Sequence, residues 1–143
     1  MNKKMNWMLT VITLVALLVG TSAYAQTAST VKASIPFDFR IGNESLPAGV
    51  YAVSNIYGAR VTLRSLDGRK TVVLMTNDIQ ANHAPADGKL VFTRFGELYF
   101  LSQIWTAGEE VGRTVIKSNA EKEMASRIAP SEASVLIAGK AGK

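Results

Sequence analysis

The chain of 143 residues has no cysteine and a single histidine, His83. Without thiols it can form no disulfide, thiolate nucleophile or zinc ribbon, so packing alone must hold the fold. One imidazole makes a poor metal site, because histidine-rich ligand sets need more than one ring. The glycines stand singly where turns are expected, which excludes a glycine-rich phosphate loop. We therefore predict no metal site and no cofactor.

Long apolar runs are also scarce, and the longest one lies near the N-terminus. Lys3-Lys4 precede the apolar stretch 7–19, and small residues close the segment at Ala25. This order is typical of a secretory signal peptide over residues 1–25, cleaved between Ala25 and Gln26. The stretch is shorter than the roughly 20 residues that cross a bilayer as a helix, so we expect cleavage and not a retained anchor. The mature chain is then exported, to the periplasm or outside the cell, with no membrane span.

Charge of one sign is not concentrated anywhere in the mature chain. The formal net charge of +5 falls to +3 when Lys3 and Lys4 leave with the leader. The basic residues stand singly between acidic ones, and Arg69-Lys70 is the one adjacent pair. Scattered charge indicates a solvated surface, whereas nucleic-acid binding favours a basic stripe interleaved with aromatic residues. We expect no nucleic-acid partner.

Alternation with period two dominates the rest of the chain. Apolar residues occupy every odd position from Val31 to Ile41, which is typical of a strand with one face in a core. Pro36 interrupts this strand and predicts either an edge strand or a break in pairing. Turn signals recur about every 8 to 12 residues, among them a two-residue hairpin signal at Asp67-Gly68. Further strands are expected at 50–54, 60–65, 70–76, 89–95, 98–106, 113–116 and 133–138.

One helix is expected near the C-terminus, between the last two expected strands. Ser118 stands three residues before Glu121, which is the spacing of a capping box, so the sequence predicts a helix over 119–128 that ends before Pro130. Its apolar positions, spaced four apart, predict a stripe that docks on the sheet: Ala120, Met124 and Ile128.

Together these elements predict one domain of the mainly β class. We expect a small antiparallel β-barrel or sandwich of seven to eight strands with one short C-terminal helix. The polar segment 77–88 is expected to be a surface loop. The predicted order is a signal peptide 1–25, an N-terminal tail 26–30, a single β-rich domain 31–138 and a frayed tail 139–143.

No motif predicts catalysis. His83 shares its expected loop with Asp78 and Asp87, but no Gly-x-Ser-x-Gly elbow supplies a nucleophile, and a solvated loop histidine is the simpler interpretation. Glu109 and Glu110 are adjacent, and adjacent side chains point in different directions, so they would not flank one glycosidic bond. We predict no catalytic residue and a protein that is not an enzyme; a hydrolase using the loop around His83 is the alternative.

Aromatic residues in or beside the expected strands are the candidates for ligand contact. Flat rings with a polar rim suit a carbohydrate or another ligand, although core packing is the commoner use of such residues. The possible ligand-contacting residues are Tyr51, Tyr57, Tyr99 and Trp105.

Five short motifs occur in a fixed order between Val31 and about Ala125. They are Ile35–Phe39, Leu46–Tyr51, Lys89–Phe92, Tyr99–Ser102 with Trp105, and Lys117–Glu121. The combination resembles a family of small uncharacterised exported bacterial proteins with the motifs IPFDF, LPAGxY, YFLSxxW and KSxAE. The resemblance implies a β-rich exported domain and carries over no catalytic residue.

The functional prediction is accordingly a non-enzymatic exported domain that acts as a binding or envelope-associated module. Its partner would be a ligand, a polysaccharide or an envelope protein, and the sequence leaves that choice and the oligomeric state open. Besides the hydrolase, the other alternative is a structural protein that self-associates through the edge containing Pro36.

Overall fold

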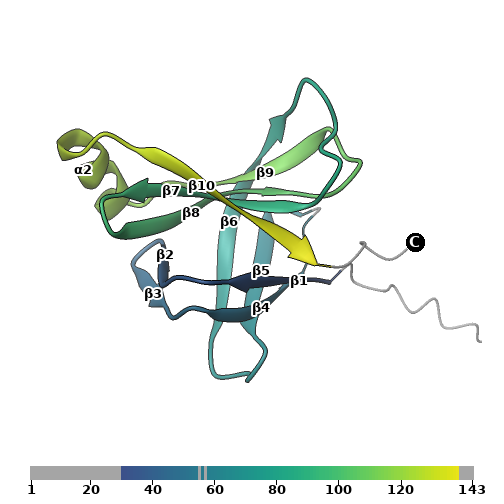
Figure 1. The fold of residues 1–143 in the computed structure, drawn as a ribbon, viewed down its shortest axis with the longest axis horizontal. Helices are drawn as coiled ribbons and strands as arrows, with labels where there is room; N and C mark the ends of the chain where they lie inside the picture. Colours follow the sequence, from purple (N-terminus) through teal and green to yellow (C-terminus); the bar gives the residue numbers. More distant parts are fainter. Residues whose placement is uncertain (1–29, 55, 57, 139–143) are drawn as a thin grey trace, which may run out of the picture.

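The structure, a computed structural model, describes residues 30–138 except 55 and 57. The predicted signal peptide, the tail before residue 30, the end 139–143 and Tyr57 lie outside the described residues. Within them, strands account for most of the chain, and one short helix lies near the C-terminal end (Figure 1). The predicted mainly β class is confirmed.

Eight antiparallel strands close into a barrel. Each strand pairs with the next around the ring, and the pairings of β6 with β9 and of β9 with β8 complete the closure. The order around the barrel is β1 (Val31–Ile35), β4 (Gly49–Ser54), β5 (Arg60–Ser65), β6 (Thr71–Gln80), β9 (Val111–Val115), β8 (Leu98–Trp105), β7 (Lys89–Phe95) and β10 (Ser131–Ala138), which returns to β1. Of the two predicted architectures, the structure has the barrel.

The alternating sequence fills the barrel interior with side chains. In β1, β5 and the first half of β6, every second residue is buried and the residues between them face outward. An eight-stranded barrel is narrow enough for side chains to fill it. The largest fully buried side chains include Tyr51, Phe39, Phe92, Phe100, Ile35, Leu46, Leu63, Leu90, Leu101 and Ile104.

The first predicted strand is interrupted at Pro36. Of the two outcomes predicted for this proline, an edge strand or a break in pairing, the structure has the break. β1 ends at Ile35, and a new strand, β2 (Phe39–Ile41), pairs in parallel with β8. β2 also forms a hairpin with β3 (Glu44–Leu46), a segment outside the strands expected from the sequence. β1 is bonded to β4 on one side and β10 on the other, so it is not an edge strand.

The predicted loop 77–88 begins later than expected. β6 continues to Gln80, because Thr76–Gln80 pair with Val111–Val115 of β9, and only Ala81–Gly88 lie between strands. The side chains of this extension are mostly exposed, and so their polarity carries no signal of a strand. The extension is a strand because its backbone pairs with β9, which lies about 35 positions further along the chain.

The helix begins where the capping spacing predicted. α2 (Asn119–Arg127) has Ser118 as its N-cap, and the Ser118 hydroxyl accepts a hydrogen bond from the Glu121 N–H at 3.1 Å. The docking stripe is wrong in detail, since Ala120 and Met124 are only half-buried and Ile128 is exposed. Glu121 is the buried residue of this helix. The helix lies outside the barrel, beside the end of β7 (Figure 1).

Ser118→Ala should loosen α2 without unfolding the barrel. The substitution removes the acceptor for the Glu121 N–H, and losing such a cap costs about 1 kcal/mol of helix stability. We expect faster amide exchange in residues 119–127 and unchanged exchange in β1 and β4. Ser118→Asp restores an acceptor and should return slow exchange; equal exchange in all three proteins would contradict the assigned cap.

Candidate functional site

An open groove runs between the β3–β4 turn and the β5–β6 hairpin. Its volume is about 450 Å³. One wall comes from Pro47–Tyr51 and the other from Ser65–Lys70. The two walls are joined by a hydrogen bond from the Leu66 N–H to the Val50 carbonyl at 3.0 Å. The groove includes one of the four predicted ligand-contacting residues, Tyr51.

The wall at Pro47–Tyr51 is held in place from two sides. Asp38 accepts a hydrogen bond from the Ala48 N–H at 2.9 Å, and the Tyr51 hydroxyl donates to the Pro47 carbonyl at 2.6 Å. The Tyr51 ring meets the Phe39 ring edge to face, with 5.2 Å between their centroids. These contacts therefore join the first two motifs of the chain. Asp38 and Phe39 belong to Ile35–Phe39, and their partners belong to Leu46–Tyr51.

The opposite wall is a hairpin tip organised by Asp67. Its carboxylate accepts hydrogen bonds from the Ser65 hydroxyl at 2.6 Å and from the Arg69 N–H at 3.0 Å. These two bonds, the Ser65 one first, lower the pKa of Asp67, so it stays ionised. Five residues, 66–70, lie between β5 and β6, where the sequence predicted a two-residue turn. Gly68, at φ +73°, donates to the Ser65 carbonyl at 2.9 Å.

The groove combines apolar and cationic surface. The side chains of Val50 and Leu66 are exposed along it. Arg69 and Lys70 line the hairpin side, and the Arg64 guanidinium reaches the same turn, since a Cβ placed on Gly68 would lie 3.4 Å from its Nη2. The same tip carries one negative charge, Asp67. Its ion pair with Arg69, at 3.9 Å, is exposed to solvent and therefore weak. The hairpin tip is net positive.

Little of the Tyr51 side chain is exposed in this groove. Its ring is buried in the core, and its hydroxyl is already bonded to Pro47. Burial raises the pKa of Tyr51, with smaller contributions from the charges of Asp67 and Asp38. Tyr51 thus shapes the floor of the groove and keeps its phenol neutral.

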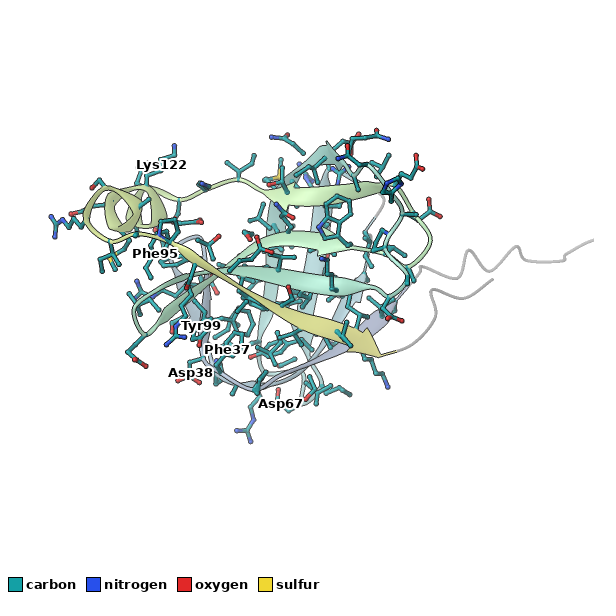
Figure 2. The ribbon with its side chains drawn as sticks, turned by 45° about the horizontal axis from the view of Figure 1, so that its top comes forward. Phe37, Asp38, Asp67, Phe95, Tyr99 and Lys122 are labelled. Carbon is teal, nitrogen blue, oxygen red and sulfur yellow. The ribbon has the colours of Figure 1, made fainter. Side chains whose placement is uncertain are left out.

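Tyr99 does not line this groove and lies beside Phe37 (Figure 2). The two rings stack with 3.8 Å between centroids and 15° between planes. The Arg94 guanidinium lies 5.4 Å from the centre of the Tyr99 ring. Phe37 and Arg94 together leave Tyr99 little free ring face for a sugar.

Trp105 is buried at the end of β8. Its indole N–H donates to the Gln103 side chain at 2.9 Å, and its ring lies directly against Gly112 of β9. Of Tyr51, Tyr99 and Trp105, only Tyr51 lines the groove.

In the described part of the chain, Asp78 of the alternative hydrolase site is paired with Arg113 and not with His83. His83 is exposed in the loop Ala81–Gly88. Asp78 lies on β6 and forms an ion pair with Arg113, which also donates to the hydroxyl of Thr76 at 3.0 Å and to its carbonyl at 3.2 Å. Asp87 is exposed. Among the described residues, no three His, Cys, Asp or Glu side chains are grouped as metal ligands would be.

Two buried charged residues escaped the sequence analysis. Arg113 occupies an otherwise ordinary strand position, and its burial follows from the partners that Thr76 and Asp78 provide. Glu121 was predicted only as a cap residue, yet it is 4% exposed and its Oε1 has no hydrogen-bond partner. The neighbouring sequence does not predict that either side chain is buried.

Glu121→Gln should stabilise the protein at neutral pH. Burial raises the pKa of Glu121, and the Lys117 charge only partly offsets this. A carboxyl whose pKa is raised by folding adds stability below its unfolded pKa, and that contribution is lost as the pH rises through the folded value. The neutral amide avoids this loss, so we expect a gain of up to about 1 kcal/mol at pH 7 that shrinks towards pH 4.

Urea unfolding of both proteins at the two pH values measures this difference. Glu123→Gln is the matched control, because Glu123 is exposed on the same helix and bonds Arg127 at 2.8 Å. It should give no gain at either pH. A gain for Glu121→Gln that does not depend on pH would contradict the buried charge.

Comparisons with known proteins do not identify the chain. No family model, no curated protein and no solved structure matches it. No helix in the described ranges is both long enough and apolar enough to cross a bilayer.

The motifs singled out in the sequence lie mainly in the core and at turns. Phe37, Phe39, Phe92 and Tyr51 form a continuous series of edge-to-face ring contacts, with 5.0, 5.5 and 5.2 Å between successive centroids when taken as Phe37–Phe92–Phe39–Tyr51. Ser102 donates to the Val91 carbonyl at 2.9 Å, where the β7–β8 register shifts. These motifs specify a fold, and the groove is a consequence of it.

Proposed function

We propose that the chain is an exported, non-enzymatic binding module of the cell envelope, and that the groove between Pro47–Tyr51 and Ser65–Lys70 contacts its ligand. The observation that carries this proposal is the combination of an exposed apolar strip with a net positive rim. The resemblance to small exported bacterial proteins, which rests on the motifs that build one wall of the groove, supports the same conclusion.

The surface chemistry favours an acidic polysaccharide as the ligand. Guanidinium groups bind carboxylates through charge-assisted hydrogen bonds, and Arg64, Arg69 and Lys70 surround the hairpin tip. The C–H face of a sugar ring can cover the exposed side chains of Val50 and Leu66. An open groove suits a polymer that passes through it better than a small molecule that must be enclosed.

Calorimetric titration with oligogalacturonate as the acidic probe and dextran as the neutral one tests the proposal. We expect binding of oligogalacturonate that weakens as salt is added, and no binding of dextran. The double variant Arg69→Glu with Lys70→Glu should lose at least tenfold in affinity. Lys122→Glu is the matched control, since Lys122 is exposed on α2, well away from Asp67 and the hairpin tip (Figure 2).

Equal affinity in the wild type and the double variant would refute the groove as the binding site. Release of shorter sugars that stops in His83→Ala would instead establish the hydrolase. Export is tested separately: the protein recovered from outside the cytoplasm should have an intact mass that begins at Gln26.

A further inference from the structure

The first half of β6 has a strand partner on one side only in the described part of the chain. Residues 71–75 pair with β5, and the pairing with β9 starts at Thr76 and continues to Gln80. Beyond the end of β9, a single hydrogen bond from the Ile116 N–H reaches the Met75 carbonyl at 3.2 Å. The backbone from Thr71 to Met75 is therefore an open sheet edge.

The direction of the β6 hydrogen bonds identifies which residues serve this edge. The Thr76 N–H donates towards β5, to the Ala59 carbonyl at 2.8 Å. In an antiparallel ladder, successive residues direct their N–H and C=O groups to opposite sides. Thr71, Val73 and Met75 therefore present theirs to the open side. Apart from the Met75 carbonyl, these groups have no partner on the open side within residues 30–138 as described, and they can pair with an added strand.

A groove of about 540 Å³ follows the open edge. Its walls are the β2–β3 turn at Ile41–Glu44 and the strand residues Val72–Met75, and Val115–Ser118 close one end. Three apolar side chains along it are each more than half exposed: Val73, Met75 and Ile116. The space thus offers main-chain hydrogen bonds together with apolar contacts.

This edge lacks the devices that usually prevent strand addition. Exposed edges are commonly protected by charges, prolines or bulges, yet residues 71–77 contain no charged residue, proline or glycine. The groove lining carries one negative charge, Glu44, and one positive charge, Lys117. A lining without net charge is complementary to an uncharged, apolar strand.

We infer that the open edge Thr71–Met75 is a site of β-strand addition, filled by one extended, uncharged apolar segment of a partner protein. A second copy of this chain does not fit. Pairing β6 with its copy about a two-fold axis at Val73 would bring residue 70 of the copy opposite Thr76, where Val115 already lies.

A capped heptapeptide of alternating valine and threonine, labelled with a fluorophore, serves as the probe. Fluorescence anisotropy with the purified chain should show saturable binding, and the same peptide with N-methylated backbone amides should bind at least tenfold more weakly. Amide exchange at Val73 and Met75 should slow when the unmethylated peptide is present. These readouts depend on the main chain and are independent of the polysaccharide groove.

Two variants of β6 and one control complete the test. Val73→Lys adds a charge to the edge, and Val73→Pro removes an N–H that faces away from β5, a place where proline is tolerated. Both should weaken peptide binding at least tenfold, while circular dichroism confirms that they fold. Leu136→Lys is the control, because Leu136 is exposed on β10, which has partners on both sides.

Three results of the peptide experiments would each overturn the inference. These are no peptide binding by the wild type, equal binding by Val73→Lys, or indifference to N-methylation. Light scattering that shows a dimer abolished by Val73→Lys would make a second copy the occupant and overturn the inference as stated.

Discussion

Phe92→Ala should destabilise the protein by about 3–5 kcal/mol, the largest single effect that we expect. The Phe92 side chain is fully buried, and its ring meets both Phe37 and Phe39 edge to face. Truncation removes a large ring from the core and leaves a cavity that the surrounding side chains can fill only in part. Such a loss is a large fraction of the 5–15 kcal/mol that usually stabilises a domain.

Urea unfolding followed by circular dichroism measures this loss. Phe92→Leu retains most of the volume and should cost less than half as much. Leu66→Ala is the surface control, since Leu66 is exposed at the hairpin tip, and it should change stability by less than about 0.5 kcal/mol. Similar costs for Phe92→Ala and Leu66→Ala would contradict a barrel packed around Phe92.

Gly112→Ala should cost about 1–3 kcal/mol although it adds a single methyl group. A Cβ at this position would lie 2.5 Å from one atom of the Trp105 ring and within 2.8 Å of two others. The indole cannot move easily, because it is buried and its N–H is bonded to Gln103. Either the ring or the β8–β9 pairing must shift.

A double-mutant cycle separates this clash from a general effect on β9. In a Trp105→Leu background the smaller side chain leaves room, so Gly112→Ala should lose most of its cost. Unfolding free energies of the four proteins give the coupling between the two positions. Gly96→Ala is not a suitable control, because Gly96 has φ +60° and would be strained in open space. Additive costs at positions 105 and 112 would contradict the contact.

The strand pattern could be predicted from sequence wherever burial alternates. The boundaries of β5 and β7 match the expected 60–65 and 89–95, because turn residues flank apolar positions of period two. The N-cap at Ser118 was predictable for the same local reason. β3 and the end of β6 were not, since Glu44–Leu46 and Asn77–Gln80 are strands only by virtue of the partners they meet.

The candidate site was only partly visible in the sequence. Tyr51 was selected as an aromatic residue, but the groove depends on the hairpin tip at Leu66–Arg69, which lies across from it. Tyr99 and Trp105 were also predicted because they are aromatic. In the structure, Phe37 stacks on the Tyr99 ring and Gly112 lies against the Trp105 ring. An aromatic side chain in a strand has the same local signature whether it is covered or free.

Local sequence determined most of the alternating strands and the start of the helix, whereas the leader at residues 1–25 stays a prediction. These depend on residues within a few positions of each other, where side-chain direction and backbone preference act directly. Only the tertiary structure decided that the strands close into a barrel, that β6 pairs with both β5 and β9, and that Thr71–Met75 have no second strand partner among the described residues. Closure and open edges depend on which distant strands meet, and pairing partners are chosen by the packing of the whole interior.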